Sequence, residues 1–268
     1  MPPVRRSAAF FDLDKTILAT SSALAFTRPF YRGGLIGRSD VVRGAYAQFI
    51  FLASGADHDQ METMRRYMSD LVTGWDVAKV REIVAETIDE IIDPAVYDEA
   101  VALMEQHRDA GRDIIIISSS GTEVVEPIGE RLGVDVAIGT QLVVEDGLYT
   151  GEILFYAYGE GKAAAMRDLA EERGYDLASS YAYTDSITDL PMLETVGHPT
   201  AVNPDADLRR VAAERDWPVL DFARPVSMRS QLSVDRRQAV AAGTAAAAMS
   251  AVALGLAWYA RSRQGRPA

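Results

Sequence analysis

Two pairs of aspartates follow apolar runs that lie far apart in this 268-residue sequence. Asp12 and Asp14 end the run "AAFFDLD", and Asp185 and Asp189 fall in the segment "SYAYTDSITD". Residues two apart in an extended chain point to the same side, so the first pair can enter one site. Carboxylates gathered in one site need a cation, and Mg²⁺ suits ligands that are all oxygen atoms. If the two runs are neighbouring strands, the sequence therefore predicts a single Mg²⁺ site.

The strand pattern favours that arrangement. Residues 8–11 and 180–185 are short apolar runs, and residues 113–118 read "DIIIIS". Unbroken apolar runs are typical of parallel strands buried on both faces. Strands and helical patterns, such as residues 159–174, alternate from position 113 onward, so we expect an α/β fold with a parallel sheet. Ligands of such folds bind beyond the carboxyl ends of the strands, where the aspartates lie.

Three local patterns predict details of this core. Residues 140–155 alternate in polarity around an Asp-Gly pair, which indicates a β-hairpin. Ser120 followed by Glu123 indicates a capping box at the start of the next helix. Pro127 lies within that helix and should kink it or make it restart.

The segment 17–110 has mostly helical patterns and is inserted after the first strand. We expect it to form a separate helical cap, with residues 1–16 and 111–228 forming the core. Within the cap, residues 45–53 are apolar on nearly every side. This stretch indicates either the interior of the cap or an apolar entrance for a lipid-like phosphate.

The charge distribution argues against one class of partner and favours another. The net charge is −12, yet residues 229–268 hold six Arg and one Asp, so the rest of the chain is strongly acidic. An acidic body argues against a nucleic-acid surface. Residues 239–260 contain no charge, and as a helix they would span about 33 Å against a hydrocarbon core of roughly 30 Å. They are predicted to be a transmembrane helix that anchors a cytoplasmic catalytic domain to the cytoplasmic membrane; the alternative is an Ala-rich helix docked on the body.

Four segments carry a resemblance to a known family. The segments are, in order, "FFDLDKT", "IIIISSS", "GEGK" and "YTDSITDLPML". This set resembles the four motifs of haloacid dehalogenase-superfamily phosphatases, in the phosphoserine-phosphatase-like branch called subfamily IB, over roughly residues 8–225. The resemblance implies a Rossmann-like core with a C1-type cap. It also implies a Mg²⁺-dependent phosphatase that acts on a small phosphorylated substrate.

The resemblance assigns roles to the four aspartates. Asp12 would be the nucleophile that forms an aspartyl-phosphate. Asp14 would be the general acid for the leaving alcohol and then the base for water. Asp12, the backbone carbonyl of Asp14, and Asp185 would hold Mg²⁺. Asp189 would support the water shell of the metal or orient Lys162.

The resemblance also assigns three residues to the phosphate group. Thr16, Ser118 and Lys162 would bind the transferring phosphoryl oxygens, where positioning and charge stabilisation dominate catalysis. Ser118 could instead be an ordinary serine at the entry to a helix. Lys15 is expected to be a solvated neighbour rather than a catalytic group.

The substrate is less defined by the sequence. In phosphoserine phosphatases of this branch, an acidic residue soon after the first motif meets the substrate amino group. Residues 17–26 contain no acid, and Ser21 stands about where that residue would be. This difference argues against phosphoserine itself. Two other functions remain open at this point: a membrane-tethered phospho-ligand-binding or scaffold protein with vestigial catalysis, and a phosphotransferase.

Overall fold

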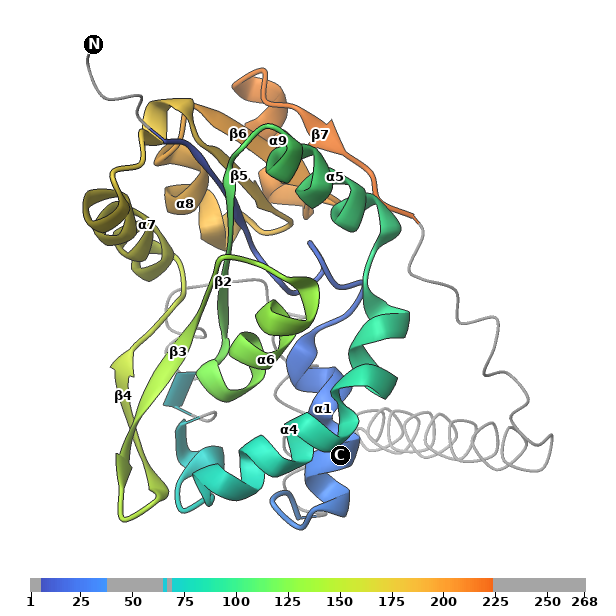
Figure 1. Cartoon of the computed structure of the whole chain (residues 1–268), viewed down its shortest axis with the longest axis vertical. Coiled ribbons are helices and arrows are strands. Elements are labelled where there is room, and N and C mark those ends of the chain that lie inside the picture. The colour runs from blue at the N-terminus through green and yellow to red at the C-terminus, as the bar shows by residue number, and fades with distance from the viewer. Residues whose placement is uncertain (1–5, 38–64, 67–68, 224–268) are drawn as a thin grey trace, which may run out of the picture. The chain divides into compact units, whose positions relative to one another are not determined.

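A computed structural model of the chain describes residues 6–37, 65–66 and 69–223 (Figure 1). The apolar stretch 45–53 and the predicted membrane span 239–260 lie outside these residues. Within the described ranges, no helix combines the length and the apolar character needed to cross a membrane. The anchor therefore stays a prediction from sequence.

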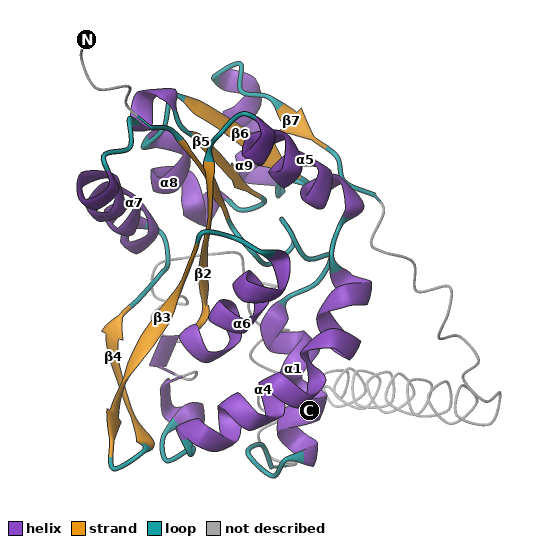
Figure 2. Ribbon diagram, in the orientation of Figure 1, coloured by secondary structure: helices purple, strands orange, loops and turns teal. Residues whose placement is uncertain are grey.

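The described residues form an α/β structure around one mostly parallel sheet, as expected (Figure 2). The strand order is β4-β3-β2-β1-β5-β6-β7, and only the β3–β4 pair is antiparallel. The strands are β1 (Ala8–Phe11), β2 (Asp113–Gly121), β3 (Val136–Glu145), β4 (Leu148–Phe155), β5 (Tyr181–Thr184), β6 (His198–Val202) and β7 (Val219–Leu220). The helices are α1 (Ser22–Arg32), α4 (Val77–Ile92), α5 (Asp98–Asp109), α6 (Thr122–Leu132), α7 (Glu160–Arg173), α8 (Leu190–Glu194) and α9 (Ala206–Glu214).

The central strands are buried because both of their faces are covered. Ile114 and Ile116 pack with residues of α5 and α6, whereas Ile115 and Ile117 pack with residues of α7, α8 and α9. Side chains alternate between the two faces of a strand, so an unbroken apolar run supplies both layers at once. Figure 1 shows β1, in dark blue, between β2 and β5, and it pairs in parallel with both.

Helices α1 and α4 lie within the predicted cap and pack on each other. A Cβ atom at Gly33 would lie 2.3 Å from a side-chain carbon of Ile83, so the helices approach closely at a residue without a side chain. The rings of Phe30 and Trp75 lie 5.5 Å apart in an edge-to-face contact beside this interface. The buried residues of α1 and α4 are continuous with the apolar cluster on one face of the sheet.

Helix α5 also lies within the range predicted for the cap, but it packs on the sheet. The His107 Nε2 atom lies 2.8 Å from the Tyr183 hydroxyl on β5, and the His107 ring meets the Phe11 ring on β1 edge-to-face at 6.1 Å. We therefore propose that the cap ends before α5, and that this helix belongs to the core.

Of the three local predictions, the hairpin is confirmed. β3 and β4 form an antiparallel pair, and both Asp146 (φ 50°) and Gly147 (φ 82°) adopt the left-handed conformation that a tight hairpin turn requires. The capping box is wrong, because the residue before α6 is Gly121 and no side chain caps the helix there. Helix α6 also continues through Pro127, so the predicted restart is wrong. A proline removes one backbone hydrogen bond, and buried side chains on both sides of it hold this helix against the core.

The burial of β1 makes a prediction about stability. Phe10 is fully buried, so Phe10→Ala should lower the free energy of unfolding by about 3–5 kcal/mol through lost burial and the cavity that remains. Leu154→Ala is the control, since Leu154 is 71% exposed, and it should change stability by less than about 0.5 kcal/mol. Urea unfolding of both variants measures this, and equal effects would argue against the described packing of β1.

Candidate active site

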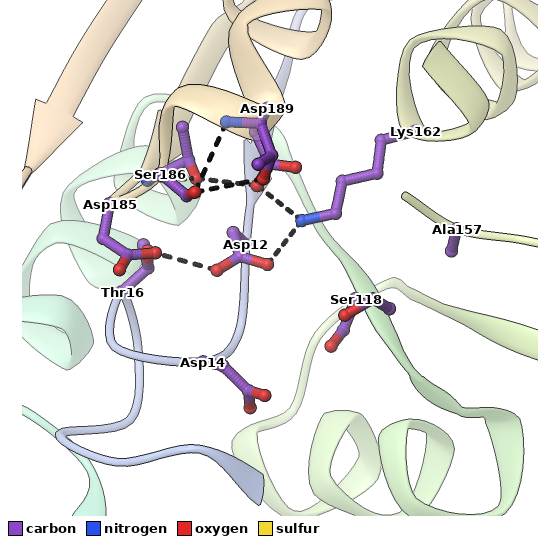
Figure 3. Close-up of polar contacts among 12 residues, drawn as sticks. Asp12, Asp14, Thr16, Ser118, Ala157, Lys162, Asp185, Ser186 and Asp189 are labelled. Carbon is purple, nitrogen blue, oxygen red and sulfur yellow. Dashed lines mark hydrogen bonds and ion pairs between the residues drawn. The ribbon is translucent and has the colours of Figure 1, made fainter. Parts of the chain in front are cut away.

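The carboxyl ends of β1 and β5 bring together two of the predicted aspartates. Asp12 directly follows β1, and its backbone N–H donates to the carbonyl of Tyr183 on β5 at 2.9 Å. Asp185 directly follows β5. Because the two strands are parallel neighbours, both carboxylates lie at the same edge of the sheet. Their side chains are drawn in Figure 3.

Lys162 reaches this edge from the first turn of α7 and contacts two of the carboxylates (Figure 3). Its Nζ atom donates to Asp12 Oδ1 at 2.5 Å and to Asp189 Oδ2 at 2.6 Å, and the residue is only 2% exposed. The "GEGK" motif explains how α7 can start so near the sheet. A Cβ atom at Gly161 would lie 2.0 Å from the carbonyl oxygen of Tyr156, so a larger residue would push the helix away.

Asp189 is fixed by a second donor. The Thr184 hydroxyl donates to the same Oδ2 atom at 2.7 Å, and Asp189 is 3% exposed. The contact of Asp189 with Lys162 is the one that its predicted role in orienting Lys162 requires.

Thr16 and Ser118, the other predicted phosphate-binding residues, are both buried. The Thr16 hydroxyl lies 3.4 Å from Asp12 Oδ2, as a long hydrogen bond. Ser118 Oγ accepts a hydrogen bond from the Ser120 N–H at 3.3 Å. Both serines belong to β2, the other neighbour of β1.

The carboxylate of Asp14 does not join the other three. β1 ends at Phe11, so the alternation of an extended strand no longer applies at Asp14. Its side chain turns toward α1, where Oδ1 accepts from the Ser22 N–H at 2.9 Å and Oδ2 accepts from the Ser21 hydroxyl at 3.2 Å. Figure 3 shows the Asp14 side chain directed away from Asp12.

The aspartates and the lysine shift one another's pKa values. Burial raises the pKa of Asp12 above its ordinary value, although the nearby Lys162 opposes that effect. Burial also raises the pKa of Asp185 to about 7, with the Lys15 ammonium acting in the opposite direction. Burial alone would lower the pKa of Lys162, but the carboxylates of Asp12 and Asp189 reverse this and raise it. Burial is therefore the main cause of the raised pKa values of Asp12 and Asp185, and Lys162 remains a charged partner of Asp12 and Asp189.

The site can be tested for its fit to Mg²⁺. Among the described residues, no group of three or more His, Cys, Asp or Glu side chains is arranged to hold a metal ion. The predicted set contains only two carboxylates, Asp12 and Asp185, with the backbone carbonyl of Asp14. Mg²⁺ is usually bound by one or two carboxylates and keeps several waters, so this donor set fits it. The Lys15 Nζ atom also lies 4.0 Å from an oxygen of Asp185, and the Lys15 side chain is mostly exposed.

Three residues make contacts in this region that the sequence analysis does not predict. Thr184 donates to Asp189, while Ser22 and Ser120 form a contact of 2.7 Å between their hydroxyls. The position of Thr184 beside the site could be predicted, because it precedes Asp185 at the end of a predicted strand. No sequence pattern predicts the contact between Ser22 and Ser120, which lie 98 positions apart.

Comparison with known proteins places this geometry in a family. The model for haloacid dehalogenase-like hydrolases matches residues 9–194. The chain is 58% identical to the inhibition of morphological differentiation protein of Streptomyces azureus, over 97% of this chain and 95% of that protein. It is 54% identical to a probable phosphatase of Mycobacterium tuberculosis, over 98% of this chain and 91% of the relative.

A more distant relative matches the branch predicted from the motifs. Phosphoserine phosphatase SerB1 of Mycobacterium tuberculosis is 36% identical, over 94% of this chain and 82% of that protein. The resemblance drawn from the four motifs is thereby confirmed at the level of the family and of its phosphoserine-phosphatase-like branch. The chain belongs to the haloacid dehalogenase-like hydrolases.

Proposed function

We propose that this protein is a Mg²⁺-dependent phosphatase that hydrolyses a small phosphomonoester through an aspartyl-phosphate on Asp12. The observation that carries the proposal is the buried contact of Lys162 with both Asp12 and Asp189 at the carboxyl edge of the sheet. The names of the relatives, a probable phosphatase and a phosphoserine phosphatase, support the same reaction class.

The first half of the reaction transfers the phosphoryl group to the protein. A carboxylate oxygen of Asp12 attacks phosphorus, the bond from phosphorus to the leaving oxygen breaks, and that oxygen takes a proton from Asp14. Lys162, Thr16 and Ser118 bind the phosphoryl oxygens during transfer. Mg²⁺, held by Asp12, Asp185 and the Asp14 carbonyl, would offset the repulsion between the phosphate dianion and the attacking carboxylate.

The second half regenerates the protein. Asp14, now a carboxylate, removes a proton from water, and the water oxygen attacks phosphorus. The bond from phosphorus to the Asp12 oxygen breaks, which releases inorganic phosphate. Asp12 returns as a carboxylate and Asp14 returns with its proton.

The substrate class follows from the start of the cap. Recognition of an amino group requires an acid near the leaving group, and the segment 17–26 has none. Ser21 instead donates to Asp14. We therefore propose a small phosphomonoester other than phosphoserine, bound between the core and the cap predicted to start at position 17.

The nucleophile is tested by a single substitution. With Mg²⁺ and an aryl phosphate, the protein should release phosphate, and Asp12→Asn should lower kcat by about 10³-fold or more, as removal of other essential nucleophiles does. Asp168→Asn, on the exposed face of α7, makes the same chemical change away from the site and should keep full activity. Unchanged kcat in Asp12→Asn would rule out the mechanism.

The raised pKa of Asp185 predicts a pH dependence of stability in metal-free buffer. Because its folded-state pKa is about 7 and its ordinary value is 3.8, ionisation of Asp185 opposes folding. The free-energy cost of ionising Asp185 in the folded state is absent when the pH is below the ordinary pKa of 3.8. It grows as the pH rises and reaches its full size above about pH 7. With a chelator present, Asp185→Asn should be more stable than the wild type by about 2 kcal/mol at pH 8, allowing for screening. The difference should vanish near pH 4, and Asp168→Asn should show no such trend.

Metal addition gives a matched test of the same residue. Millimolar Mg²⁺ should raise the unfolding temperature of the wild type, because a ligand that binds only the folded state stabilises it. Asp185→Asn should lose most of that increase, since it removes one of the two carboxylates. Equal protection of the wild type and this variant by Mg²⁺ would exclude Asp185 as a ligand.

A further inference from the structure

The start of helix α1 holds the carboxylate of Asp14 through two donors. The Ser22 N–H donates to Oδ1 and the Ser21 hydroxyl donates to Oδ2. Ser21 is the residue that precedes the helix, yet its side chain makes no capping bond, and the first turn of α1 contains no acidic residue. Asp14 therefore supplies the negative group that the N-terminus of a helix favours.

The same helix start is tied to the core on its other side. Ser22 is fully buried, and its hydroxyl lies 2.7 Å from that of Ser120 on β2. The N–H of Ser120 in turn donates to Ser118 Oγ at 3.3 Å. A short chain of hydrogen bonds thus connects the proposed acid to a proposed phosphate-binding residue.

The two oxygens of Asp14 have different neighbours, and this difference matters for proton transfer. A backbone N–H can only donate, so Oδ1 must accept. A hydroxyl can donate or accept, so the Ser21 hydroxyl can face Oδ2 in either state, by donating to the carboxylate or by accepting from the protonated acid. Oδ2 is therefore the oxygen that can carry the proton, and Ser21 contacts it directly.

We propose that Ser21 is a positioning residue for proton transfer by Asp14. Its hydroxyl holds Oδ2 in place, by accepting from the protonated acid until the proton moves to the leaving oxygen and by donating to the carboxylate afterwards, while the Ser22 N–H fixes the orientation of the carboxyl group. This inference rests on the proposed phosphatase function, in which the leaving oxygen takes its proton from Asp14 as its bond to phosphorus breaks. It also gives a role to the serine that stands where relatives of the phosphoserine type place an acid.

Leaving groups of different basicity separate this role from a structural one. An alkyl phosphate needs a proton on its leaving oxygen, whereas 2,4-dinitrophenolate leaves without one. The ratio kcat/KM reports the steps up to departure of the leaving group. It therefore measures the role of Asp14 as an acid separately from its later role as a base. Ser21→Ala should lower kcat/KM about tenfold for ethyl phosphate and less than about twofold for 2,4-dinitrophenyl phosphate. The loss for ethyl phosphate is smaller than the full contribution of a general acid, because Asp14 itself remains.

Three further variants complete the experiment. Ser21→Thr keeps a hydroxyl and should restore kcat/KM for ethyl phosphate to within about threefold of the wild type. Thr27→Ala removes a hydroxyl of the same helix that donates to the carbonyl of Ala23 at 2.9 Å, and it should leave kcat/KM for both substrates unchanged. Asp14→Asn should show the same selective loss as Ser21→Ala, but a larger one.

Each outcome has one meaning. An equal loss on both substrates in Ser21→Ala, or no loss on either, overturns the positioning role while the phosphatase function stands. An inactive wild type, or an Asp14→Asn variant that does not discriminate between the leaving groups, overturns the proposed function and this inference with it. A selective loss that Ser21→Thr does not reverse also contradicts the role of the hydroxyl.

Discussion

The central constraint on this structure is the burial of negative charge at one edge of the sheet. Asp12, Asp185 and Asp189 are each at most 9% exposed, and the one buried lysine near them contacts two of the three. Burial of a charged group is costly unless the charge is paired and hydrogen-bonded. Three such carboxylates together favour either protonation or further positive charge at this edge, and the proposed Mg²⁺ would supply that charge with few ligands.

Several features of the fold bring these charged side chains together. The placement of β1 between β2 and β5 puts Asp12, Ser118 and Asp185 at one edge, although they come from three distant segments. The glycines of "GEGK" let α7 begin close enough for Lys162 to reach that edge. Two strand ends, one position within β2 and the start of α7 thus contribute to the site, and the start of α1 adds a fifth contribution through its contact with Asp14.

Much of this arrangement could be predicted from the sequence, and the failures have physical causes. The run Ile114–Ile117 specifies a buried parallel strand, because both faces of that strand must be apolar. The capping box failed because β2 continues through Ser120 to Gly121, and the Ser120 hydroxyl contacts Ser22, a tertiary contact that local sequence does not contain. The direction of Asp14 is not predicted by the strand pattern because β1 stops at Phe11, and the start of α1 then binds both oxygens of the Asp14 carboxylate. The link between Ser22 and Ser120 depends on the same tertiary packing.

The account is tested most directly by diffraction from crystals soaked in Mn²⁺, which scatters anomalously and replaces Mg²⁺ in sites that are all oxygen. One strong anomalous peak is expected at the carboxyl edge of the sheet, between the carboxylates of Asp12 and Asp185 and the backbone carbonyl of Asp14. A well-ordered site that shows no peak there, with Lys162 alone between the carboxylates at saturating Mn²⁺, would contradict the claim that the buried charge is balanced by a divalent cation.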